Sequence, residues 1–162
     1  MMIEPLESRE YFAFSYSLKG GVLTVVGTQV ADVISINNIN SKTIAVGASS
    51  ADLKSVLSKT FKTTQVKQVK ILAGSGNDHV TCHSLARTVK LTIDGGSGDD
   101  ILQGSMSGVN TIIGGAGKDF MSAGTGGATF QSKGDRAFDH ITAYNGDTIV
   151  ADTTDKTHIL RK

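Results

Sequence analysis

Three copies of one glycine-rich pattern, all between residues 72 and 124, limit the folds open to this chain more than any other feature. The copies occupy residues 73–81, 95–103 and 114–122 and follow the form G-G-x-G-x-D-x-U-x, where U is a large apolar residue. The first copy begins with Ala73 in place of the first glycine. Glycine adopts positive φ without a steric penalty, so each copy predicts a sharp turn that leads into a strand.

The spacing of the copies indicates that they stack. Asp100 follows Asp78 by 22 residues, and Asp119 follows Asp100 by 19. Two strands and two turns occupy about that length, so each copy predicts one coil of a solenoid, with the glycine turns on one edge. The side chains expected to stack in the core are Val69/Ile71, Leu91/Ile93 and Asn110/Ile112 before the turns and Val80, Leu102 and Met121 after them. The polar Asn110 indicates either an internal amide hydrogen bond or a fault in the register.

This pattern resembles the hemolysin-type (RTX) calcium-binding repeats of secreted bacterial proteins. The resemblance extends from about residue 23 to residue 150 and is most specific over residues 72–124. It implies an all-β fold, a right-handed parallel β-helix or β-roll with degenerate terminal coils, and a secreted, extracellular location. The first residues, with Leu6-Glu7-Ser8-Arg9, also resemble the short leader that opens many secreted proteins of planctomycete-type bacteria.

The residue types suit calcium. Calcium takes about 6–8 oxygen ligands from carboxylates, carbonyls and water, and one turn cannot supply that many, so each ion would lie between two stacked turns. Three turns make two gaps, hence about two Ca²⁺ sites. The opposite edge, at residues 82–85, 103–106 and 122–125, lacks aspartate and is expected to bind no calcium. The candidate ligands are Asp78, Asp100 and Asp119, the neighbouring Asn77 and Asp99, and carbonyl oxygens around Gly74, Gly76, Gly96, Gly98, Gly115 and Gly117.

Outside the repeats the pattern weakens. We expect residues 1–18 to be a leader or N-terminal arm and residues 19–162 to be a single solenoid domain. Asp32 stands in the repeat position of a turn without its glycines, and residues 37–64 interrupt the repeat with a strand at 43–47 and a short helix at 50–59. That insertion either caps the fold or mediates contacts. Further on, Asp139 and Ile141 keep the repeat spacing, 145–150 predicts a turn and strand, and 158–162 predicts a last strand.

Composition and the absence of known motifs limit the classes of function open to the chain. Sixteen basic and fifteen acidic residues leave the chain near neutral, so nothing indicates nucleic acid as a partner, and no apolar stretch approaches a membrane helix. No nucleophile elbow, phosphate loop or zinc motif is present, which argues against an enzyme. A lone Cys82 excludes an internal disulfide. The alternative to a calcium-binding module is a structural protein that assembles end to end, or by exchanging strands, into a filament or surface layer.

Overall fold

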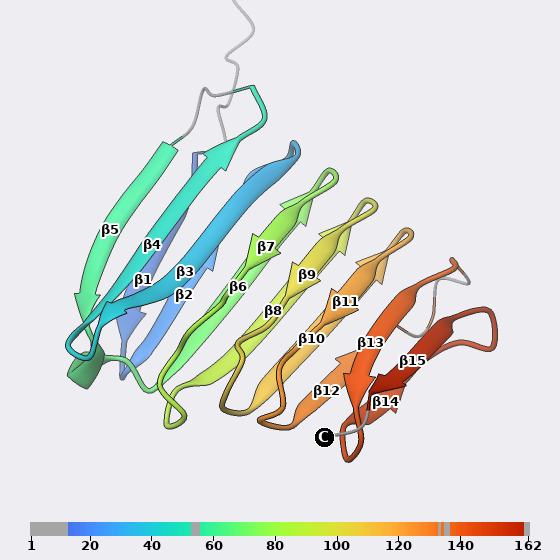
Figure 1. The fold of residues 1–162 in the computed structure, drawn as a ribbon. Coiled ribbons are helices and arrows are strands. Elements are labelled where there is room, and N and C mark those ends of the chain that lie inside the picture. Colours follow the sequence, from blue (N-terminus) through green and yellow to red (C-terminus); the bar gives the residue numbers. More distant parts are fainter. Residues whose placement is uncertain (1–12, 53–55, 133, 135–136, 161–162) are drawn as a thin grey trace, which may run out of the picture.

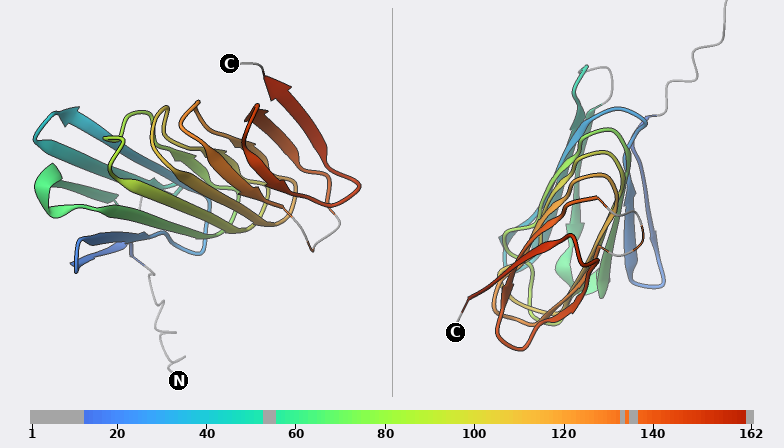
Figure 2. Two further views of the ribbon diagram at one scale, coloured as in Figure 1. Left: turned by 90° about the horizontal axis from the view of Figure 1, so that it is seen from below. Right: turned by 90° about the vertical axis from the view of Figure 1, so that its right-hand side faces the viewer.

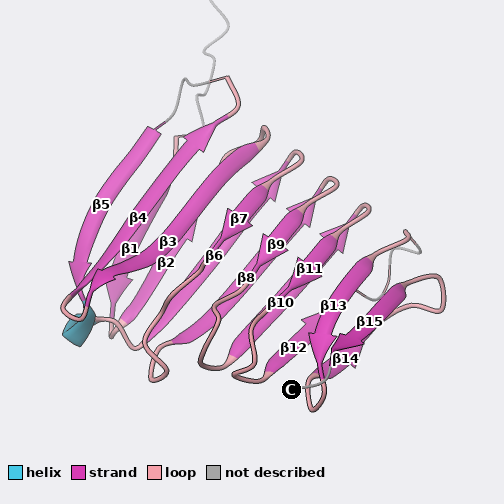
Figure 3. Cartoon of the chain, in the orientation of Figure 1, coloured by secondary structure: helices cyan, strands magenta, loops and turns pink. Residues whose placement is uncertain are grey.

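The chain forms a β-solenoid in which two sheets face each other across a narrow core (Figures 1 and 2). The computed structural model describes residues 13–52, 56–132, 134 and 137–160. Nearly all of the described elements are strands, as Figure 3 shows. The predicted all-β solenoid of stacked parallel coils is therefore confirmed.

The first sheet has seven strands and is parallel from its second strand onward. The added first strand runs antiparallel to its neighbour. In spatial order the strands are β1 (Ser15–Lys19), β2 (Val22–Val26), β6 (Gln68–Ser75), β8 (Lys90–Ser97), β10 (Asn110–Ala116), β12 (Ala128–Gln131) and β14 (Thr148–Val150).

The second sheet has eight strands, and its repeat strands are also parallel. An antiparallel extension of two strands lies at its N-terminal end. In spatial order the strands are β15 (Lys156–Leu160), β13 (His140–Tyr144), β11 (Phe120–Ser122), β9 (Ile101–Gln103), β7 (His79–Thr81), β3 (Asp32–Asn40), β4 (Thr43–Ser50) and β5 (Val56–Lys62).

Side chains at equivalent positions of successive coils stack into columns that fill the core, as the repeat spacing predicts. In the first sheet Ile71 pairs in register with Ile93, and Ile93 pairs with Ile112. In the second sheet Val80 pairs with Leu102, and Leu102 with Met121. All six side chains are fully buried. Burying a side chain of this size contributes about 1.5–3 kcal/mol, so each coil stabilises its neighbours mainly through these stacked residues.

The insertion corrects one prediction. The helix expected at residues 50–59 is not formed: β4 ends at Ser50, residues 53–55 lie outside the described part, and β5 begins at Val56. The edge of β4 offers backbone hydrogen bonds along its length, and β5 pairs with it from Ser49↔Val56 to Thr43↔Lys62. Tertiary pairing of this kind overrides a weak helical periodicity. A single three-residue 3-10 helix, η1 (Thr63–Gln65), follows.

The N-terminal boundary also differs from the prediction. Residues 15–18, assigned to the arm, belong to β1 and pair with β2. Residues 1–12, which include the proposed leader, lie outside the described residues. Within residues 37–64, β4 and β5 extend the second sheet beyond β3. The strand expected at 43–47 is confirmed as part of β4. The strand expected at 158–162 corresponds to β15, which spans Lys156–Leu160, and residues 161–162 lie outside the described part.

Candidate metal centre

The glycine turns stack on one edge of the solenoid, where β6, β8 and β10 lead into β7, β9 and β11 (Figure 1). We call this the glycine-turn edge. A Cβ atom on Gly96 would meet the carbonyl oxygen of Gly74, and one on Gly98 would meet that of Gly76. The carbonyl oxygens therefore lie between neighbouring coils, in space that only glycine leaves open. The glycines with positive φ in these turns are Gly74, Gly76, Gly96, Gly98, Gly115 and Gly117.

Aspartates form a continuous column along this edge. In each case the backbone N–H of one aspartate donates to Oδ1 of the aspartate in the next coil. The N···O distances are 2.8 Å for Asp32 to Asp78, 2.8 Å for Asp78 to Asp100, 3.0 Å for Asp100 to Asp119, 2.8 Å for Asp119 to Asp139 and 3.2 Å for Asp139 to Asp155. We call these six residues the aspartate column. The three predicted aspartate ligands thus lie in adjacent coils within one hydrogen-bonded series.

Two aspartates in the middle of the column, Asp78 and Asp100, have a second carboxylate oxygen, Oδ2, that is buried and makes no hydrogen bond. A Cβ atom on Gly95 would meet both Oδ2 of Asp100 and the carbonyl oxygen of Gly114, so two oxygens from adjacent coils face the same small space. A buried anionic oxygen without a donor costs free energy unless a positive charge or a proton compensates it.

The pKa values reflect this environment. The pKa of Asp78 is raised to about 7, chiefly by burial and also by the carboxylates of Asp100 and Asp32, against the lowering effect of the hydrogen bond from the Asp32 N–H. Burial likewise raises the pKa of Asp100 to about 6, with smaller contributions from Asp99 and Asp94. The folded chain therefore favours a bound proton, or another cation, at these carboxylates.

Asn77 and Asp99 lie on the exposed rim of the turns and make contacts of another kind. Oδ1 of Asn77 accepts the backbone N–H of Asp99 at 3.0 Å, and Oδ1 of Asp99 accepts that of Lys118 at 2.8 Å. These side chains connect each turn to the next coil, in the direction opposite to the aspartate column. Lys118 has no acceptor oxygen in its side chain, so this second series stops there.

At the opposite edge of the solenoid, the side-chain hydrogen bonds come from neutral groups. Oδ1 of Asn110 accepts the N–H of Ser105 at 3.0 Å, and Nδ2 of Asn110 donates to the carbonyl oxygens of Ser105 and Gly108. The Ser105 hydroxyl oxygen accepts the N–H of Leu85 at 3.1 Å. Of the two interpretations of Asn110, the internal amide hydrogen bond is correct.

Sequence reasoning missed residues at both ends of the column. Thr28 donates to Asp32 from both its backbone N–H and its hydroxyl, and Ser132 donates its hydroxyl to Asp155. Asp155 escaped notice because it follows Asp139 by only 16 residues, less than the spacing of the repeats. A signal for Thr28 exists, because it stands four residues before Asp32 where the repeat has its second glycine.

Side chains alone do not assemble a metal site in the described part of the chain: no group of three or more His, Cys, Asp or Glu is placed to hold an ion. Any ion at the glycine-turn edge would need backbone carbonyls as well as carboxylates, which is the mixture that calcium accepts. Two histidines directly follow aspartates of the column, His79 after Asp78 and His140 after Asp139. His140 stacks on Phe120, with ring centroids 5.0 Å apart. Among the described residues, no helix is long and apolar enough to span a membrane.

Residues 94–129 match the RTX calcium-binding nonapeptide repeat family, in its four-copy form. These residues therefore have the sequence of RTX-type calcium-binding repeats. The match covers less than a quarter of the chain and takes in the second and third glycine turns, while the RTX-like turn at 73–78, with its Ala73, precedes it. Comparisons with curated proteins and with solved structures returned no match.

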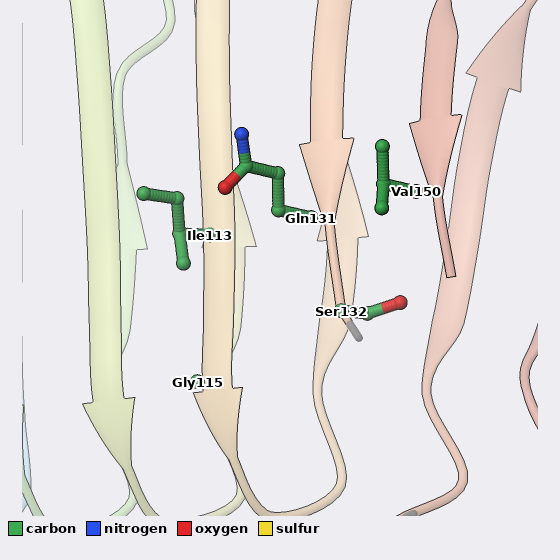
Figure 4. Close-up of a pocket in the computed structure, with 5 residues that line it drawn as sticks. All are labelled: Ile113, Gly115, Gln131, Ser132 and Val150. Atoms are coloured by element: carbon green, nitrogen blue, oxygen red, sulfur yellow. The ribbon is translucent and has the colours of Figure 1, made fainter. Parts of the chain in front are cut away.

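A pocket on the outer face of the first sheet carries no comparable chemistry. It is lined by Ile113 and Gly115 of β10, Gln131 of β12, Ser132 directly after β12, and Val150 of β14 (Figure 4). None of these groups is ionisable near neutral pH, and the one hydroxyl, on Ser132, donates to Asp155.

Proposed function

We propose that this protein is an extracellular module that binds calcium between its stacked glycine turns and is stabilised by it. The observation that carries this proposal is the pair of buried Oδ2 atoms, on Asp78 and Asp100, that make no hydrogen bond. A bound divalent cation would supply the positive charge that these carboxylates lack. Because the ion binds only the folded turns, binding would stabilise the fold.

Two gaps fit this role best. One lies between the turns at 73–78 and 95–100, and the other between 95–100 and 114–119. Asp100 takes part in both, since its Oδ1 accepts the N–H of Asp78 on one side while its Oδ2 and the carbonyl oxygen of Gly114 face the same space near Gly95. Calcium would add bonds from carboxylate and carbonyl oxygens of one coil to those of the next.

The small number of carboxylates at the glycine-turn edge supports an extracellular location. Each turn contributes one inward carboxylate, and calcium affinity rises with the number of charged ligands. Such sites belong with extracellular modules, which bind calcium with a Kd of about 10⁻⁴–10⁻³ M. A secreted or cell-surface location, the usual one for RTX repeat proteins, is therefore part of the proposal.

Thermal unfolding in EDTA and in millimolar calcium tests the proposal, with wild type compared with Asp100→Asn. Asparagine keeps an oxygen for the N–H of Asp78 but removes the buried charge. We expect Asp100→Asn to melt at a higher temperature than wild type in EDTA, because one of the two unpaired carboxylates is removed, and to lose most of the calcium-dependent rise.

Asp94→Asn is the matched control. It removes one carboxylate from β8, but Asp94 is half-exposed, lies before the glycine turn and contributes least of the named causes to the raised pKa of Asp100. This variant should keep most of the calcium-dependent rise. Wild type without a calcium response, or Asp100→Asn with an undiminished response, would reject the proposal.

A second candidate function, end-to-end assembly, is favoured by the last coil. Ile159 of β15 pairs in register with Ala143, which is fully buried, yet Ile159 is 58% exposed. Within the described residues, no strand pairs with the other side of β15. Another copy could extend the sheet there. Light scattering with and without calcium tests this: assembly that Ile159→Lys abolishes supports it, and a monomer under both conditions rejects it.

A further inference from the structure

The two ends of the aspartate column differ from its middle. At the first aspartate, Asp32, the Thr28 backbone N–H donates to Oδ2 at 2.6 Å and the Thr28 hydroxyl donates to Oδ1 at 2.8 Å. Both residues are buried, with exposed fractions of 6% for Thr28 and 1% for Asp32. One threonine therefore supplies a donor to each oxygen of a buried carboxylate.

The last aspartate, Asp155, is satisfied in a similar way. Its Oδ2 accepts the hydroxyl of Ser132 at 2.7 Å and the backbone N–H of Asp152 at 2.6 Å. Its Oδ1 accepts the N–H of Asp139. Ser132 is buried, and its hydroxyl reaches across from the preceding coil.

The repeat turns have no equivalent donor. In the turn of Asp100, the position of Thr28 is occupied by Gly96, which has no side chain and adopts φ of +101°. The Oδ2 atom of Asp100 consequently makes no hydrogen bond, and neither does that of Asp78. At Asp32 the Thr28 hydroxyl pairs the carboxylate within the protein, whereas at Asp78 and Asp100, where glycine stands in its place, one carboxylate oxygen is left for another partner.

From this contrast we propose that the hydroxyls of Thr28 and Ser132 take the place of calcium at the two ends of the aspartate column. The end turns are then folded without metal, and the glycine turns of Asp78 and Asp100 between them require calcium. This inference rests on the proposed function, and it adds which turns respond to the ion and which residues decide that. A hydrogen bond to a charged acceptor is strong enough to retain a buried carboxylate in the folded state.

The N-terminal end has additional support for metal-free folding. β3, which begins at Asp32, pairs with β4 over nearly its full length, and β4 pairs with β5. Ala51 also donates its N–H to the carbonyl oxygen of Ala31, next to the Thr28 turn. This part of the sheet is held by backbone pairing that involves no glycine turn. It offers calcium-free chains an ordered surface on which the RTX coils can stack.

Hydrogen exchange of the full chain, measured by mass spectrometry in EDTA and in calcium, tests the proposal. In EDTA, wild type should keep slow exchange over residues 22–50 while residues 68–122 exchange quickly, and calcium should slow the latter. Thr28→Val keeps the β-branched shape and removes the hydroxyl. In EDTA it should speed exchange over residues 22–50 by about tenfold or more.

Two further variants serve as controls. Thr28→Ser retains the hydroxyl and should behave as wild type. Thr111→Val removes a hydroxyl from the half-buried outer face of β10 and should leave residues 22–50 unchanged. If Thr28→Val does not fold, Ser132→Ala applies the same test to residues 140–160 at the other end.

The results separate this inference from the proposed function. If Thr28→Val exchanges as Thr111→Val does, or if wild type loses protection over 22–50 as readily as over 68–122 in EDTA, the hydroxyls do not replace calcium. If calcium fails to slow exchange over 68–122 in wild type, the proposed calcium function is rejected. The effect of Thr28→Val in EDTA then still shows whether the hydroxyl holds the first turn.

Discussion

The two edges of the solenoid differ in the chemistry of the side chains that lie between successive coils. At the opposite edge, the amide of Asn110 and the hydroxyl of Ser105 satisfy neighbouring backbone groups with neutral hydrogen bonds. At the glycine-turn edge, the inward side chains are carboxylates, and Oδ2 of both Asp78 and Asp100 lacks a donor. The contacts of Asn110 and Ser105 are complete within the protein, whereas we propose that the glycine-turn edge gains stability from a bound cation. Variants at the two edges should therefore respond differently to calcium.

The largest effect is expected at Gly96. A Cβ there would meet the backbone carbonyl of Gly74, and φ is +101°. Gly96→Ala combines backbone strain with a clash that cannot relax, so we expect a loss of about 3 kcal/mol or more in the free energy of unfolding. Urea unfolding in calcium measures it.

Gly127 provides the matched control at the opposite edge. Its φ is +96°, close to that of Gly96, but a Cβ there would meet nothing within 4 Å. Gly127→Ala should therefore show the strain alone, about 1–2 kcal/mol. Equal losses at both positions would show that close stacking of the glycine turns contributes little.

A smaller effect, independent of calcium, is expected at Asn110. Asn110→Leu keeps the branched shape of a fully buried side chain but leaves the N–H of Ser105 and the carbonyl oxygen of Gly108 without these partners. The carbonyl oxygen of Ser105 loses one donor and keeps the N–H of Gly124. We expect a loss of about 2 kcal/mol, of the same size in EDTA and in calcium. Asn145→Leu, at an exposed turn, is the control and should change stability little. A loss at Asn110 that calcium reverses would contradict the view that this edge is closed by neutral groups.

The sequence predicted the repeating part of this molecule well because the same signal occurs three times. The register of Ile71, Ile93 and Ile112 follows from their equal offsets before each glycine turn, and the structure confirms it. The aspartates of the candidate site follow from the same spacing. Residues that occur once were harder to interpret, because no second copy tests the interpretation.

The helix expected at residues 50–59 is one such case. The spacing of the apolar residues favoured a helix. In the fold, however, β5 pairs with the edge of β4, and the sequence alone does not reveal that this edge is available. The closing residues are another. The hydroxyl of Thr28 matters because the fold leaves Asp32 buried beside it, and that of Ser132 because the next coil brings Asp155 to it. The contact of Ser132 with Asp155 joins two coils and cannot be derived from a local pattern, whereas Thr28 lies only four residues before Asp32.

The smallest expected effect is a dependence on pH that only the glycine-turn edge should show. The pKa of Asp78 is raised to about 7 and that of Asp100 to about 6 in the folded state, chiefly by burial. The folded state then binds protons more readily than the unfolded chain, whose aspartates titrate near 3.9. Stability is greatest when both carboxylates are protonated and falls as pH rises from about 4 to 7. Metal-stripped wild type should consequently melt roughly 3 °C or more higher at pH 5 than at pH 8. The double variant Asp78→Asn/Asp100→Asn keeps every histidine and should lose this difference, as should wild type in saturating calcium. If the double variant keeps the whole pH dependence, the unpaired carboxylates are not what distinguishes the two edges.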